Sequence, residues 1–98
     1  DIFYEDFSYD INQDKNIYFY KHTIIARLDY FTFHLGEDSK ELRKLFVEEG
    51  IIKTFKCDGK LMDNKVIKLN GKPTRCVVFE RTYLLEKGFD FNEKGDLI

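Results

Sequence analysis

The side chains that could act as nucleophiles or metal ligands are few and widely spaced along the chain. A Ser–His or Cys–His pair needs the nucleophile held against an oriented base, and no GxSxG or comparable frame is present. The two His and two Cys follow one another at intervals of 12, 23 and 19 residues, which match none of the close pairs that zinc sites use. Glycine-rich phosphate loops are absent as well. The sequence therefore predicts no catalytic residue, no metal and no cofactor; the candidates weighed are Ser8, His22, His34, Ser39, Cys57 and Cys76.

A second group of side chains with chemical potential is basic. Residues 50–82 carry a net charge of +5, and several of these bases fall at or between expected turns. Positively charged hairpin tips suit phosphate contact, which makes nucleic-acid binding the alternative function. Against it stand a sequence pI of about 5.7 and the lack of a second helix for a helix-turn-helix. Lysines on edge strands also discourage aggregation. The bases in question are Lys60, Lys65, Lys68, Lys72 and Arg75.

The opposite charge gathers at the start of the chain. Residues 1–14 hold five acids and no base, interleaved with Phe and Tyr. Exposed Tyr is favoured at protein interfaces, so we expect this acidic aromatic arm (1–16) to contact a protein partner. The competing interpretation is that the arm covers the domain's own core. The predicted contact residues are Tyr4, Asp6, Phe7 and Tyr9, with Tyr18 and Tyr20 as second choices.

The elements that must position these groups begin with residues 17–35, which are overwhelmingly β-branched and aromatic and predict two strands or one long bent strand. A helix is predicted over 39–49. Asp38 and Glu41 have the spacing of a capping box, and Gly50 is placed to end the helix.

A strand meander is expected over 51–85. It begins with a strand over 51–57, and the stretch from Tyr83 to Gly88 is expected to be either a strand extension or a single helical turn. Asp58-Gly59 and Asn70-Gly71 are signals for two-residue hairpin turns. The second turn predicts a register in which Leu69 faces Lys72, Ile67 faces Thr74 and Val66 faces Arg75. Because Pro73 lacks an amide donor, its strand should be short there or lie at an edge.

Together these elements predict one α+β domain over residues 1–98. About five strands form a mostly antiparallel sheet, which the helix at 39–49 covers. A β-grasp-like arrangement has the same order of elements.

Composition narrows the class of protein. The chain has 98 residues, of which 43% are apolar and 16% aromatic, and its net charge is −2, which excludes intrinsic disorder. No apolar run approaches the roughly 20 residues that a membrane-spanning helix needs, so no membrane partner is expected. Two cysteines form no disulfide framework, which favours a reduced cytoplasmic protein. Phe, Tyr, Met, Ile, Asn and Lys make up 43 residues, which indicates an A/T-rich, low-GC genome.

The functional prediction is a small non-enzymatic module that binds another protein. Its size and composition suit an accessory or inhibitor protein of a phage or other mobile element. Nucleic-acid binding is the alternative, and a small enzyme without a recognisable motif ranks third.

Overall fold

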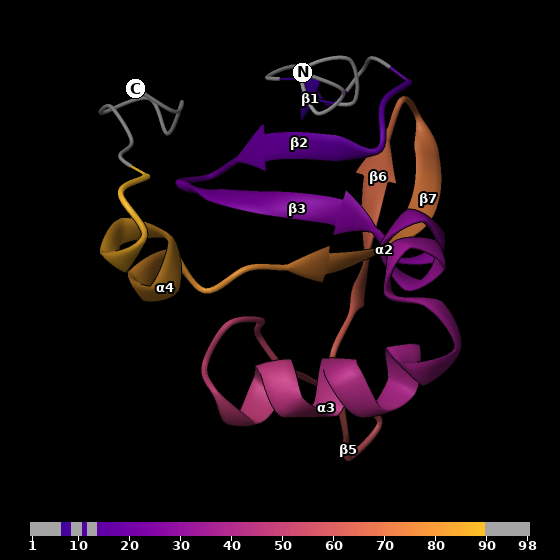
Figure 1. Cartoon of the computed structure of the whole chain (residues 1–98). Coiled ribbons are helices and arrows are strands. Elements are labelled where there is room, and N and C mark those ends of the chain that lie inside the picture. Colours follow the sequence, from indigo (N-terminus) through magenta and orange to yellow (C-terminus); the bar gives the residue numbers. More distant parts are fainter. Residues whose placement is uncertain (1–6, 9–10, 12–13, 90–98) are drawn as a thin grey trace.

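Two β-hairpins pair side by side and form the main sheet at the centre of the molecule (Figure 1). The computed structural model describes residues 7–8, 11 and 14–89. The strands are β1 (Phe7–Ser8), β2 (Ile17–Tyr20), β3 (Thr23–Arg27), β4 (Phe55–Cys57), β5 (Lys60–Met62), β6 (Lys65–Leu69) and β7 (Lys72–Val78). The helices are α2 (Leu28–Leu35), the 3₁₀ helix η1 (Gly36–Asp38), α3 (Ser39–Glu48) and α4 (Arg81–Glu86).

The strands form one five-stranded sheet and one separate hairpin. The large sheet has the order β1-β2-β3-β7-β6, in which the short β1 is parallel to β2 and the other pairs are antiparallel. Strands β4 and β5 pair only with each other among the described residues. The prediction of a mostly antiparallel α+β domain is confirmed, whereas the β-grasp-like arrangement is not.

Both glycine-containing hairpin turns form as predicted. Asp58-Gly59 and Asn70-Gly71 have positive φ at both positions, as type I′ turns require. The register of β6 and β7 is the predicted one. Pro73 lies in the part of β7 that extends beyond its pairing with β3, so its missing amide costs no ladder hydrogen bond on that side.

The prediction of strands throughout 17–35 is wrong in its second half, because the chain turns from β3 directly into helix α2. Residues 17–25 are rich in β-branched side chains, but residues 28–35 contain a single one, Thr32. In this stretch Leu28, Phe31 and Leu35 recur at helical spacing, and aromatic residues favour strands only where packing supports them. The ring of Phe31 contacts Phe46 of α3 and Phe79 after β7, which places this side of α2 against the rest of the molecule.

The predicted helix at 39–49 is confirmed as α3. Gly50 has φ of 73°, the Gly50 amide donates to the Val47 carbonyl, and the Ile51 amide donates to the Phe46 carbonyl, which together make a Schellman motif. The predicted capping by Asp38 does not occur, because η1 leads into α3 and leaves Asp38 without the extended backbone of a cap residue. Nor does α3 alone cover the sheet: α2 contacts β3 and β7, while α3 packs mainly on α2 and η1.

One segment of the predicted meander differs, and another adopts one of its two predicted conformations. The strand expected over 51–57 begins only at Phe55, and Ile52 forms a single bridge with Phe79. At the end of the meander the helical alternative is the one that forms: it is the helix α4, which closes with the Gly88 amide donating to the Leu85 carbonyl and the Phe89 amide to the Leu84 carbonyl.

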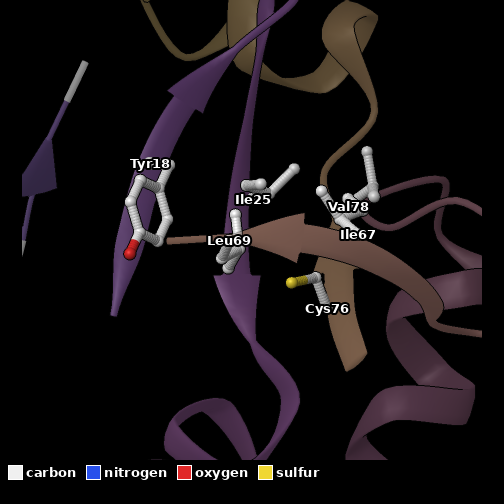
Figure 2. Close-up of a cluster of buried hydrophobic side chains, with 6 residues drawn as sticks. All are labelled: Tyr18, Ile25, Ile67, Leu69, Cys76 and Val78. Atoms are coloured by element: carbon white, nitrogen blue, oxygen red, sulfur yellow. The ribbon is translucent and has the colours of Figure 1, made fainter. Parts of the chain in front are cut away.

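The core lies on both faces of the sheet. Successive residues of a strand point to opposite faces, so Tyr18 and Phe19 of β2 enter different clusters. The second cluster lies under α4 and consists of Phe19, Ile24 and Leu84. The first gathers between β2, β3, β6 and β7 (Figure 2) and consists of Tyr18, Ile25, Ile67, Leu69, Cys76 and Val78.

Candidate interaction surface

The predicted contact residues of the acidic aromatic arm are only partly within the described structure. Tyr4, Asp6 and Tyr9 lie outside the described residues. Phe7 belongs to β1, whose backbone pairs with β2. This part of the prediction therefore stays a prediction.

The two second-choice tyrosines of β2 have different environments. Tyr18 has no exposed surface, and its hydroxyl accepts a hydrogen bond of 2.8 Å from the Lys15 amide. Its prediction as a partner contact is wrong, because it lies on the strand face that packs against Ile25. Tyr20 is half-buried at the rim of the same cluster, and the Lys21 ammonium lies 5.0 Å from its ring centroid.

The five bases of the alternative function are exposed, but strand alternation separates them. Lys68 and Arg75 lie on one face of the β6–β7 hairpin, whereas Lys65 and Lys72 lie on the other. The Lys65 ammonium is 5.1 Å from the ring centroid of Phe55. Lys60 belongs to the separate β4–β5 hairpin. The arrangement therefore does not bring the five bases together on one surface of the sheet.

The potential nucleophiles are also separated. Both cysteines are free thiols: Cys57 is exposed in β4 and Cys76 is buried in β7. Burial raises the pKa of the Cys76 thiol to about 11, so it stays protonated and unreactive at neutral pH. His22 lies in the β2–β3 turn and His34 on α2. Within the described part of the chain, no three His, Cys, Asp or Glu side chains are grouped to hold a metal ion.

A different surface emerges on α2, a helix that is rich in apolar side chains and yet has no buried residue. Its inner side carries Leu28, Phe31 and Leu35. The opposite side, here called the α2 outer face, combines acids with aromatic rings. It consists of Asp29, Tyr30, Phe33 and His34, and the exposed Glu37 follows it in the chain, in η1.

Phe33 stands at the centre of the α2 outer face. Its side chain is 80% exposed, more than any other large apolar side chain among the described residues. The His34 ring lies beside it, with centroids 5.5 Å apart and planes at 89°. The Tyr30 ring also contacts His34, with centroids 4.5 Å apart and planes at 60°. The three rings thus form an edge-to-face row along the helix.

Acidic groups border this aromatic row. Asp29 lies one helical turn before Phe33 on α2, Glu37 follows in η1 after the helix ends, and both are exposed. The Asp29 carboxylate accepts a hydrogen bond of 2.7 Å from the Tyr30 amide at the start of α2. Residues 28–39 contain three acids and no Lys or Arg. The α2 outer face is therefore apolar at its centre and negative at its rim.

Because residues 28–35 were predicted to form a strand, the α2 outer face could not be recognised from the sequence. On a strand, Phe31 and Phe33 share a side, whereas on a helix they lie roughly 160° apart. The helical spacing of Leu28, Phe31 and Leu35 was the available signal, and it places Phe33 outside.

Comparisons of the chain with protein-family models, with curated proteins and with solved structures find no match. None of the helices in the described residues combines the length and apolar character needed to cross a membrane.

Proposed function

We propose that the chain is a small non-enzymatic module that binds another protein through the α2 outer face. The observation that supports this most directly is Phe33, a large apolar side chain left 80% exposed on a helix with no buried residue. Aromatic side chains are enriched among the residues that dominate binding energy, and they anchor best in pockets that exclude water. Full burial of a Phe contributes about 1.5–3 kcal/mol from apolar area alone.

The chemistry of the α2 outer face defines the partner. Phe33 requires an apolar pocket, and the carboxylates of Asp29 and Glu37 favour bases around that pocket. The edge-to-face row with Tyr30 and His34 holds the helix surface in one geometry, which lowers the entropy lost on binding. The proposed partner is a protein with an apolar pocket in a basic surface.

The biological setting follows from composition. An A/T-rich coding pattern in a small domain fits an accessory or inhibitor protein of a phage or other mobile element, acting in the cytoplasm. The acidic aromatic arm, with Tyr4, Asp6, Phe7 and Tyr9, stays a candidate second contact.

A pair of matched variants tests the proposal. Phe33→Ala removes the anchor, and Leu85→Ala removes a 42% exposed side chain from α4 as a control. We expect a protein captured from a host extract by wild type and by Leu85→Ala to be lost with Phe33→Ala. Measured with that purified protein, the affinity should fall roughly 10- to 100-fold for Phe33→Ala and less than about 3-fold for the control.

The proposal fails if folded Phe33→Ala retains every partner that wild type retains. Circular dichroism and denaturant unfolding establish that both variants are folded. Because neither side chain is buried, both should keep wild-type stability to within about 0.5 kcal/mol.

A further inference from the structure

An open groove of about 590 Å³ lies between α3 and the β4–β5 hairpin. In Figure 1 these elements lie at the same end of the molecule. The groove is distinct from the α2 outer face, with which it shares no residue. Its lining comes from α3 (Lys40, Arg43, Lys44, Val47 and Glu48) and from the β4–β5 hairpin with the residues that flank it (Thr54, Leu61, Met62, Asp63 and Asn64).

Three apolar residues line the groove: Leu61 and Met62 from β5 and Val47 from α3. Leu61 is 69% exposed and faces Lys56 across the β4–β5 hairpin. Met62 and, from α3, Val47 are partly buried and line the same space. An exposed Leu beside a Met and a Val provides a site for one large apolar side chain.

The α3 side of the groove is positive. Lys40 and Lys44 are exposed one helical turn apart, where like charges oppose helix stability slightly. Neither ammonium forms an ion pair with any described residue. Arg43, between them, already has a partner, since its guanidinium lies 3.0 Å from an Asp63 oxygen. The positive charge available to a ligand is therefore that of the two lysines, opposed only by Glu48 and the paired Asp63.

A polar network fixes the two sides of the groove relative to each other. The Asp63 carboxylate accepts from Arg43 of α3 at 3.0 Å and from the Asn64 amide at 2.7 Å. The Asn64 oxygen in turn accepts from Arg75 of β7 at 3.0 Å. Asn64 is buried, and the network joins α3 to the sheet across the β5–β6 turn. The two sides of the groove are thereby connected before any ligand binds, which reduces the ordering cost of binding.

We propose that this groove binds an acidic protein segment carrying a large apolar side chain. The apolar side chain lies against Leu61, Met62 and Val47, and flanking carboxylates lie near Lys40 and Lys44. Charge complementarity selects this occupant over a basic or purely apolar segment. The proposal concerns a second surface and does not depend on the α2 outer face.

Fluorescence anisotropy with a labelled synthetic peptide tests the groove directly. The probe is Gly-Asp-Glu-Leu-Glu-Asp-Gly, and the control probe has Ser in place of Leu. We expect the Leu probe to bind wild type at least 5-fold more tightly than the Ser probe, with affinity falling as salt rises. Leu61→Ser and Lys44→Glu should each weaken binding of the Leu probe by about 10-fold. Lys72→Glu, an exposed reversal outside the groove, should leave it within 2-fold.

Three results would overturn the proposal. Equal binding of the Leu and Ser probes would mean that the groove is a general anion surface. Unchanged binding by Leu61→Ser and Lys44→Glu, both folded, would place the peptide elsewhere. Concentration-dependent self-association in sedimentation that Leu61→Ser abolishes would identify a second copy of this chain as the occupant. Phe33→Ala leaves the groove intact. Its effect on the capture of a partner through the α2 outer face is therefore independent of these three results.

Discussion

The two hairpins of the main sheet, β2–β3 and β6–β7, both have two-residue turns, but they differ in how much of their two faces is exposed to solvent. In β2–β3 both faces are covered, since Tyr18 and Ile25 enter one cluster while Phe19 and Ile24 enter the other. In β6–β7 one face packs against the core, and the other leaves Val66 51% exposed beside Lys68 and Arg75. Both hairpins contribute fully buried side chains, Tyr18 and Ile25 from the first and Leu69, Cys76 and Val77 from the second, but only the second leaves part of one face exposed, where it carries charge.

The turns of the two hairpins also differ, in how well their residues suit a left-handed backbone. Asn70-Gly71 provides residues suited to positive φ, whereas the β2–β3 turn places Lys21 at φ 48° and His22 at φ 66°. Left-handed backbone costs a residue with a Cβ roughly 1–2 kcal/mol. The first hairpin accepts that strain because burial on both faces fixes its register regardless of the turn.

The largest difference between the hairpins should appear on removing apolar side chains. Ile25→Ala in β3 creates a cavity in the first cluster and should lower the free energy of unfolding by about 2–5 kcal/mol. Val66→Ala in β6 removes an exposed side chain and should change it by less than about 0.5 kcal/mol. Urea unfolding measures both. Similar losses from the two variants would mean that burial does not distinguish the hairpins.

A pH titration tests the buried end of β7, where that strand leaves the second hairpin to pair with β3. Burial raises the pKa of Cys76 from its ordinary 9.0 to about 11, so the unfolded chain loses its thiol proton first. The stability due to the protonated thiol is therefore complete below pH 9 and is lost as pH rises from 9 towards 11, by on the order of 2 kcal/mol.

Cys76→Ala supplies the comparison for this titration. Its overall stability is lower because a buried side chain is removed, but the extra loss between pH 9 and 11 should be absent. Parallel alkaline curves for wild type and the variant would show that Cys76 does not titrate differently on unfolding. Iodoacetamide should meanwhile alkylate the exposed Cys57 and spare Cys76 in the folded protein.

Removing the glycine from one turn and introducing a glycine into the other should change the free energy of unfolding in opposite directions. Gly71→Ala places a Cβ at φ 76° and should cost about 1–2 kcal/mol, even though nothing lies within 4 Å of the added atom. Lys21→Gly relieves the same strain in the first hairpin, although it also loses the contact with the Tyr20 ring. The net gain should be a few tenths of a kcal/mol, by thermal unfolding. A loss of 1 kcal/mol in Lys21→Gly would mean that this turn is not strained.

The contrast between the hairpins also explains what could be predicted from the sequence. Asn70-Gly71 specifies a register locally, so every pair of β6 with β7 was predictable. The Lys21-His22 turn carries no such signal, because its conformation follows from burial contributed by residues far along the chain, such as Val78 and Leu84. The helix α2 was missed for the same reason, since Phe31 becomes an inner residue only when Phe46 and Phe79 are placed against it. With α2 taken as strand, the outward position of Phe33 could not be seen.

The smallest effect is expected from the charges on the two faces of β6–β7, and it bears on the nucleic-acid alternative. Lys68→Glu with Arg75→Glu reverses one face, and Lys65→Glu with Lys72→Glu reverses the other. Because alternation divides the bases, we expect only weak binding of single- or double-stranded DNA or RNA at low salt, lost by about 150 mM and similar in both double variants. Gel retardation across a salt series measures it. If binding survives 150 mM salt and is lost in only one of the two double variants, the face that this variant reverses is a nucleic-acid interface. The second hairpin would then have the binding function that we assign to α2.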